Sequence, residues 1–186
     1  SFSEENMKKI LDLFPGDPQK KNFSSLEKHL NGDLQAVSDY RVFKSTNNPK
    51  DSIDLLPFSE SSFGNPSERQ NFDGNFYSRS SLNYLLGLSF LKSSLPGFIP
   101  RTVLEIGGGF GTLGEILNQV PSLDIKYIDI DLPPIFLIAA EYVRNACSLK
   151  DDEYMLSSLN DSSDVIDIGE LPLFSFFPTW KIEKLR

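Results

Sequence analysis

The second half of the 186-residue chain predicts an α/β fold built on a parallel β-sheet. Short β-rich runs alternate there with helical segments, in the order strand, helix, strand, helix, strand. The expected strands are residues 102–106, 125–130 and 165–168, and the expected helices are residues 111–120 and 133–147. This order is typical of parallel strands joined by right-handed crossovers.

The first half of the chain predicts helices and loops. Helices are expected over residues 3–14, 24–30 and 33–43, the first because its apolar residues recur at helical spacing. Residues 45–77 are rich in Ser, Asn, Gly and Pro, which predicts a long irregular stretch of the kind that is often functional or mobile. A further helix over residues 80–95 then leads to the first strand.

The composition is that of an ordinary globular protein, with 39% hydrophobic and 24% charged residues. Eighteen Lys and Arg residues face 26 Asp and Glu residues, which gives a net charge of −8. We therefore expect no nucleic-acid partner, because phosphate binding needs a basic surface. An acidic chain does not favour anionic membrane surfaces either.

Localisation and metal binding are constrained by what the sequence lacks. No segment approaches the ~18 consecutive apolar residues of a membrane span, and the N-terminus carries no signal-peptide pattern. A cytoplasmic protein without a membrane partner is therefore expected. The single cysteine, Cys147, and the single histidine, His29, exclude an intrachain disulfide, a Cys-rich zinc site and any mechanism that needs two histidines.

A glycine cluster follows the first predicted strand. Five of the 12 glycines lie between residues 107 and 114. Glycine is needed where the backbone turns tightly or approaches a ligand closely, and the helix that follows would present free N–H groups. Strand, glycine loop and helix together predict a Rossmann-like site for a nucleotide-like ligand at the carboxyl edge of the sheet.

Two registers of these glycines point to different cofactors. In the first, residues 109–114 satisfy the G-x-G-x-x-G pattern of dinucleotide-binding proteins. Asp129 then lies twenty residues after Gly109, where an acid that binds ribose belongs. This register predicts an oxidoreductase that uses NAD or NADP. Asp129 is equally compatible with a salt-bridged strand residue.

The second register is the glycine motif of methyltransferases that use S-adenosyl-L-methionine (SAM). It consists of an acid and three alternating glycines: Glu105, Gly107, Gly109 and Gly111. Asp131 follows twenty residues after the last glycine, although an aspartate before Pro-Pro is also a good helix-entry residue. We favour this register because it gives a role to the carboxylate of Glu105, which is costly in a buried parallel strand unless it is paired.

The same residues resemble a bacterial family of sugar O-methyltransferases. Residues 103–111 (VLEIGGGFG) and 127–133 (YIDIDLP) are similar to the family's glycine motif and to its strand ending in Asp-Leu-Pro. Residues 64–66 and 177–180 (FPTW) are similar to flanking segments of the family. The resemblance covers residues 60–186. It implies a Rossmann-like SAM-dependent methyltransferase that transfers a methyl group to a hydroxyl of a sugar.

The resemblance also implies roles for individual residues. One acid and four glycines would shape the SAM pocket, namely Glu105, Gly107, Gly108, Gly109 and Gly111. Asp131 would accept hydrogen bonds from the ribose hydroxyls, and the acceptor would be a small molecule or a saccharide. The family's sheet continues beyond the third strand, so we expect residues 76–186 to form an incomplete SAM-binding domain after a helical and irregular region, residues 1–75. A non-catalytic Rossmann remnant is therefore a further alternative.

Catalytic residues are not identified by the sequence, and neither is the oligomeric state. His29 lies on a charged helix face and is better explained as a solvated residue. Tyr77 and Arg79, before the first strand, are further candidates near the SAM site, Arg79 for the methionine carboxylate. Trp180 is a candidate for stacking on a sugar or for a core anchor. The acidic stretch over residues 161–167 matches no metal motif.

Overall fold

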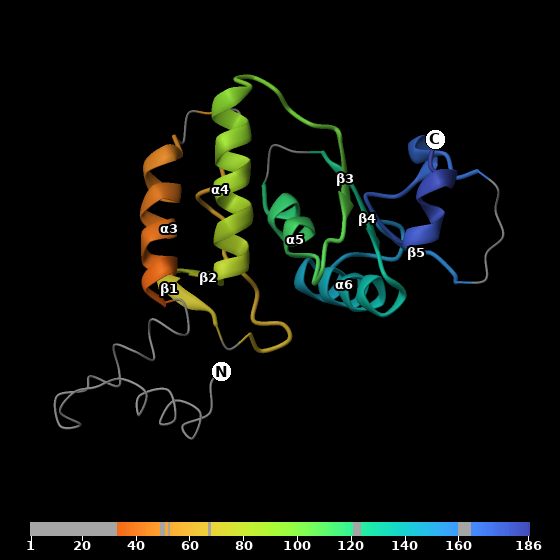
Figure 1. The fold of residues 1–186 in the computed structure, drawn as a ribbon, viewed down its shortest axis with the longest axis horizontal. Helices are drawn as coiled ribbons and strands as arrows, with labels where there is room; N and C mark the ends of the chain where they lie inside the picture. Colours follow the sequence, from red (N-terminus) through yellow and green to blue (C-terminus); the bar gives the residue numbers. More distant parts are fainter. Residues whose placement is uncertain (1–32, 49–50, 52, 67, 121–123, 160–164) are drawn as a thin grey trace, which may run out of the picture.

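A computed structural model describes residues 33–48, 51, 53–66, 68–120, 124–159 and 165–186. Two of the predicted helices, over residues 3–14 and 24–30, lie outside these ranges. Figure 1 shows helices α3 and α4 side by side, with α5 between α4 and a parallel sheet, so the α/β class is confirmed. Of the helices in the described ranges, none combines the length and the apolar character that crossing a membrane requires.

The main sheet has four parallel strands in the spatial order β3, β4, β6, β5. Helix α5 (Thr112–Asn118) connects β3 to β4, and helix α6 (Pro133–Ala146) follows β4. This arrangement is compatible with a Rossmann-like fold. The strand bounds are β3 (Thr102–Ile106), β4 (Lys126–Asp131), β5 (Tyr154–Leu156) and β6 (Phe174–Pro178).

The strand predicted over residues 165–168 is wrong. Ile166 makes only one isolated bridge, to Leu185, and the 3-10 helix η2 begins at Ile168. The Asp167 side chain caps η2 by accepting the Gly169 N–H at 2.7 Å, a local bond that competes with strand pairing. β6 is buried throughout and occupies the place beside β4 instead.

An antiparallel hairpin replaces part of the predicted irregular stretch. Strands β1 (Gln70–Phe72) and β2 (Asn75–Tyr77) pair across a two-residue turn. Both turn residues have positive φ, 52° at Asp73 and 94° at Gly74. Asp-Gly is a strong hairpin signal for this reason, and it is the sequence feature that could have predicted the hairpin.

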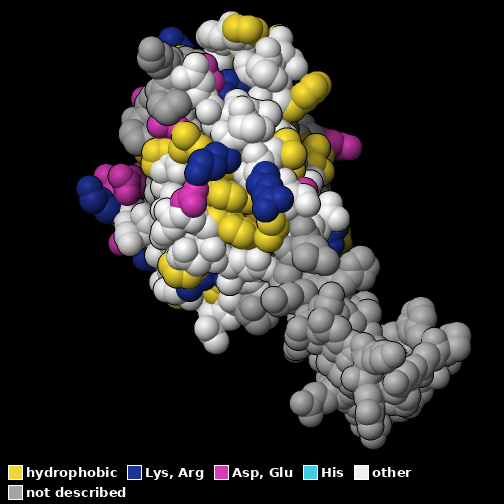
Figure 2. Space-filling model, turned by 90° about the vertical axis from the view of Figure 1, so that its left-hand side faces the viewer, with side chains coloured by type: hydrophobic (Ala, Val, Ile, Leu, Met, Phe, Trp, Pro, Cys, Tyr) yellow, Lys and Arg dark blue, Asp and Glu magenta, His cyan; other side chains and the backbone are white. Residues whose placement is uncertain are grey.

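Helix α3 (Asp33–Thr46) packs against α4 (Arg79–Ser94), and α4 packs against α5. Their shared core joins the two predicted regions, because residues before and after position 75 belong to one cluster. Its fully buried members include Phe43, Leu55, Phe58, Tyr77, Leu82, Leu85 and Ile116. Seen from the α3 side, hydrophobic side chains lie between Lys and Arg side chains in the middle of the visible face (Figure 2).

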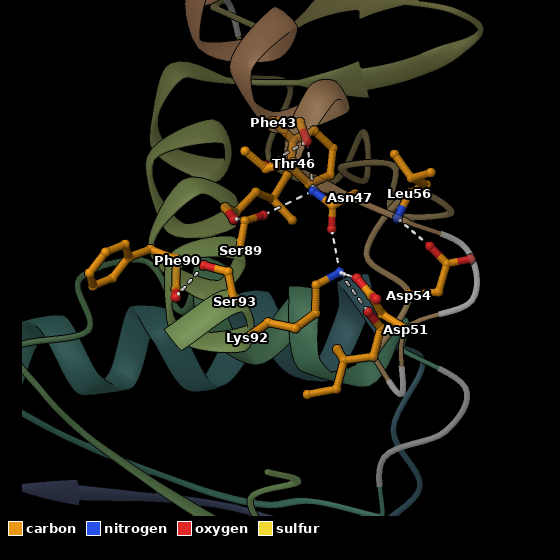
Figure 3. Close-up of polar contacts among 12 residues, drawn as sticks. Phe43, Thr46, Asn47, Asp51, Asp54, Leu56, Ser89, Phe90, Lys92 and Ser93 are labelled. Atoms are coloured by element: carbon orange, nitrogen blue, oxygen red, sulfur yellow. Dashed lines mark hydrogen bonds and ion pairs between the residues drawn. The ribbon is translucent and has the colours of Figure 1, made fainter. Parts of the chain in front are cut away.

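A buried lysine joins α4 to the segment that follows α3. The Lys92 ammonium lies 3.0 Å from the Asp51 carboxylate and donates to Asn47 Oδ1 at 2.8 Å and to the Ile53 carbonyl at 2.9 Å (Figure 3). Its side chain is only 8% exposed. Asn47 extends the network by donating to Ser89 Oγ at 2.9 Å. One cation thus holds α4 to the segment that follows α3.

We expect Lys92→Ala to lower the free energy of unfolding by about 2 kcal/mol, because it removes a charged hydrogen-bonding group from a buried position. Urea denaturation measures the change. Lys44→Ala is the matched control, since Lys44 pairs with Asp73 where both side chains are 58% exposed. The control should lose much less stability, and equal losses would show that the Lys92 network is not special.

Candidate functional site

The turn after β3 is built from left-handed glycines. Gly107, Gly109 and Gly111 have φ angles of 79°, 62° and 81°, which residues with a side chain rarely adopt. The Gly107 N–H donates to the Ile130 carbonyl at 2.8 Å and so extends the β3–β4 ladder into the turn. A Cβ on Gly111 would lie 2.5 Å from Cγ2 of Val143 in α6. The sequence motif is therefore required by the backbone and by helix packing.

The glycine turn lies close to two carboxylates at Gly108, whereas Gly107 and Gly109 face open space. A Cβ on Gly108 would lie 2.5 Å from Asp129 Oδ1 and 2.9 Å from Glu105 Oε2. A Cβ on Gly107 or Gly109 would meet nothing within 4 Å. The backbone is thus accessible at positions 107 and 109, where a ligand can approach it closely.

Glu105 is paired by two tyrosine hydroxyls. Tyr84 in α4 donates to Oε1 at 2.7 Å, and Tyr127 in β4 donates to Oε2 at 2.5 Å. Burial, followed by the hydrogen bond to Glu105, raises the pKa of Tyr84 well above its ordinary value. Burial and the nearby carboxylates raise the pKa of Tyr127 in the same direction. Both hydroxyls therefore stay protonated and compensate the burial of Glu105.

Asp131 fastens the glycine turn to the end of β4. Its Oδ2 accepts the Gly109 N–H at 2.9 Å, and its Oδ1 accepts the Leu132 N–H at 2.6 Å. The N-cap of α6 is Leu132, so Asp131 is not the capping residue. Each carboxylate oxygen has two lone pairs, and one on each remains for a ligand hydroxyl. Asp131 is 8% exposed.

Asp129 lies one pleat deeper than Asp131. It is fully buried, and no side chain among the described residues donates to its carboxylate oxygens. Burial, and then the charges of Glu105 and Asp131, raise its pKa to about 7, while the backbone N–H groups of Gly108 and Ile130 act in the opposite direction. Since Asp129 is closed off from solvent, it is poorly placed to bind a ribose as the dinucleotide register requires.

A cavity of about 830 Å³ adjoins the glycine turn. Its wall is formed by the segment before β1, the start of α4, the tip of the glycine turn and the middle of α6. The described lining residues are Glu60, Phe63, Gly64, Pro66, Glu68, Ser78, Ser80, Phe110, Thr112, Leu137, Ile138, Glu141 and Tyr142. The sequence indicated none of these as a site, although Phe110 within a run of glycines is an unusual exposed aromatic.

Buried Glu115 in α5 fixes two walls of this cavity. Its Oε1 accepts the Ser61 N–H at 2.7 Å, and its Oε2 accepts the Tyr142 hydroxyl at 2.7 Å. Burial raises the pKa of Glu115, while the bonds from Tyr142 and Ser61 act in the opposite direction. The segment before β1 is thus held against α6, and the Phe63 and Tyr142 ring centroids lie 6.1 Å apart.

None of the other described candidates from the sequence lines the cavity or bonds to the glycine turn. Arg79 is exposed at the first residue of α4, and Tyr77 is a core residue. Trp180 is 49% exposed in the 3-10 helix η3 (Thr179–Lys184), so it is not a core anchor. His29 and residues 161–164 lie outside the described residues. Within the described ranges, no three His, Cys, Asp or Glu residues are arranged to hold a metal ion.

Comparisons of this chain with protein-family models, with curated proteins and with solved structures found no match. Function must therefore be inferred from the residues of the site. The arrangement brings together all six predicted cofactor residues, namely Glu105, Gly107, Gly108, Gly109, Gly111 and Asp131. They meet at the carboxyl ends of β3 and β4, where ligands bind in open α/β sheets.

The burial of Asp129 predicts how stability depends on pH. Its pKa rises from 3.8 in an unfolded chain to about 7, so the native state binds a proton that the unfolded state has released. Native stability therefore falls as pH rises from about 4 to about 7. Asp129→Asn removes this fall and should be more stable than wild type at about pH 8, by on the order of 3 kcal/mol.

Urea denaturation over this pH range measures the effect. Asp152→Asn, which removes a carboxylate from an exposed position, controls for the change in net charge. At about pH 4 the Asp129→Asn variant and the wild type should differ little, because Asp129 is neutral in the native state and still partly protonated in the unfolded state. A difference that stays constant with pH would contradict a protonated Asp129.

Proposed function

We propose that this protein is a SAM-dependent O-methyltransferase that transfers a methyl group to a hydroxyl group of a sugar. The observation that carries the proposal is the meeting of Glu105 and Asp131 at an open glycine turn. They come from the ends of two adjacent parallel strands, and the backbone between them is accessible at Gly107 and Gly109. Such a surface can take a ligand that bears both ribose hydroxyls and a positive charge.

The residues of this turn fit the cofactor in three respects. Asp131 keeps free lone pairs for ribose hydroxyls, while its bond to Gly109 holds the turn in place. Glu105 is held by two tyrosine hydroxyls and places negative charge where a sulfonium and an ammonium group are favoured. The absence of a Cβ at Gly107 and Gly109 allows close approach.

When bound, the cofactor supplies an electrophilic methyl group. The chain's own contribution is alignment, because methyl transfer is an in-line displacement whose rate depends on holding the acceptor oxygen in position. Two features serve this purpose. Asp131 fixes the glycine turn relative to β4, and Gly111 allows α6 to pack closely behind it.

A second candidate function is an oxidoreductase that uses NAD or NADP. It is favoured by Gly114, where a Cβ would lie 2.8 Å from Cε1 of Tyr127, since the third glycine of the dinucleotide pattern allows close packing of helix on sheet. Against it, the ribose acid of that register would be the buried Asp129. Gly109 also does not close the strand, because the ladder already continues to Gly107.

Calorimetric titration with S-adenosylhomocysteine, NAD and NADP tests the proposal. We expect the wild type to bind S-adenosylhomocysteine, and Gly109→Val to bind it at least about tenfold more weakly because the new side chain would occupy the open approach. Gly97→Val is the matched control, since Gly97 also has positive φ with nothing within 4 Å of its Cβ.

Both variants place a side chain in left-handed backbone, so both should lose roughly 1–2 kcal/mol of stability. Only Gly109→Val should lose the ligand. Binding of NAD or NADP without S-adenosylhomocysteine would overturn the proposal in favour of the second candidate. Equal loss of binding in the two variants would show that the effect arises from stability alone.

A further inference from the structure

The cavity beside the glycine turn has a chemistry of its own. We propose that it is the acceptor site, and that it takes a hydroxylated ring bearing a protonated amine and no phosphate or carboxylate. This inference rests on the proposed function and names its substrate class. The cavity volume of about 830 Å³ lies within the range of small-molecule sites and accommodates a sugar ring with a substituent.

The cavity lies next to the proposed cofactor residues without including them. Phe110 stands between Gly109, whose N–H is bound by Asp131, and Gly111, which packs on α6. The Phe110 side chain is 69% exposed and lines the cavity together with Thr112. One short turn therefore contributes its backbone to the cofactor surface and an aromatic side chain to the cavity. Donor and acceptor surfaces meet at this turn.

The charges of the lining favour a cation. Glu60, Glu68 and Glu141 line the cavity, and none of the described lining residues carries a positive charge. Glu60 is buried and positioned, because its Oε2 accepts from the Ser78 N–H and from Ser81 Oγ at 2.9 Å. A lining that contains carboxylates and no cation repels phosphates and carboxylates and attracts an ammonium group.

Arg69 and Arg79 are neighbours of lining residues in the sequence, but neither lines the cavity itself. Arg69 donates from Nη1 to the Glu60 backbone carbonyl at 3.1 Å, and its guanidinium lies 4.4 Å from the centre of the Phe76 ring. It is therefore engaged outside the lining. An anionic acceptor, such as a sugar joined to a nucleoside diphosphate, would find no charge-assisted donor among the described lining residues.

The aromatic and hydroxyl side chains suit the rest of such a ligand. Phe63, Phe110 and Tyr142 offer ring faces for the C–H face of a sugar and for cation–π contact with an amine. The Tyr142 hydroxyl is already bonded to Glu115, so its ring rather than its polar end serves the cavity. Ser80 and Thr112 supply hydroxyls that can bond those of the ring.

Ligand-observed NMR with three probes that share one ring tests the proposal on the full chain. The probes are the methyl glycosides of glucosamine, glucose and glucuronic acid, in mildly acidic buffer where the amine is protonated. We expect affinity to fall from glucosamine to glucose, with no binding of glucuronic acid. In Glu68→Gln/Glu141→Gln, the preference for the amine over glucose should fall about tenfold, while glucose itself changes little.

Both substituted glutamates are exposed, so the fold should tolerate the change. Glu183→Gln, another exposed glutamate outside the lining, is the matched control and should keep the preference. S-adenosylhomocysteine binding, measured on the same proteins, reports on the cofactor surface separately. It should persist in all variants and should not displace the glucosamine probe.

The possible results separate the acceptor class proposed for the cavity from the methyltransferase function on which it rests. S-adenosylhomocysteine binding with no sugar binding, or with anionic sugars preferred, overturns the acceptor class and leaves the methyltransferase proposal intact. The acceptor class is likewise overturned if the variant Glu68→Gln/Glu141→Gln keeps the full preference for the amine over glucose. Displacement of the amine by S-adenosylhomocysteine would show that the cavity belongs to the cofactor, which also overturns the inference. Failure of S-adenosylhomocysteine to bind rejects the methyltransferase proposal itself.

Discussion

The turn that joins β3 to α5 must reverse direction where there is little room for side chains. Three of its residues are left-handed, and at Gly108 and Gly111 a Cβ would overlap a neighbouring side chain. Because glycine satisfies these constraints, the parallel ladder continues to the first residue of the turn, and α6 packs directly behind its last. The positions of Glu105 and Asp131 relative to each other follow from this turn, and both proposed binding surfaces depend on it.

Three carboxylates beneath the turn differ in how the structure compensates their burial. Glu105 is bonded by two tyrosine hydroxyls, and Asp131 accepts two backbone N–H groups. Asp129 has no side-chain hydrogen-bond partner among the described residues, and burial together with the charges of Glu105 and Asp131 raises its pKa to about 7. Below about pH 7 the raised pKa therefore favours the neutral, protonated form of Asp129.

The region before the sheet contributes directly to the site. Tyr84 of α4 pairs with Glu105. Glu60 and Phe63 line the cavity from the segment before β1. Ser78 of α4 bonds to Glu60, and Glu115 of α5 bonds to Ser61 between the two lining residues. Helix α4 is in turn held by its packing against α3 and by the Lys92 network, which joins it to the segment after α3. A single core spanning both predicted regions explains how a segment rich in Ser, Asn, Gly and Pro can line a cavity of defined shape.

The sequence by itself determined β3, β4, the helices on either side of them and the residues that meet at the turn. These follow from short-range patterns, namely periodicity, strand propensity and glycine spacing. Only the tertiary structure decided that residues 174–178 form the strand beside β4, and that Asp129 is buried while Asp131 reaches the edge. The cavity was likewise decided by packing. Strand partners, burial and cavity walls join residues far apart along the chain, and no local pattern records such contacts.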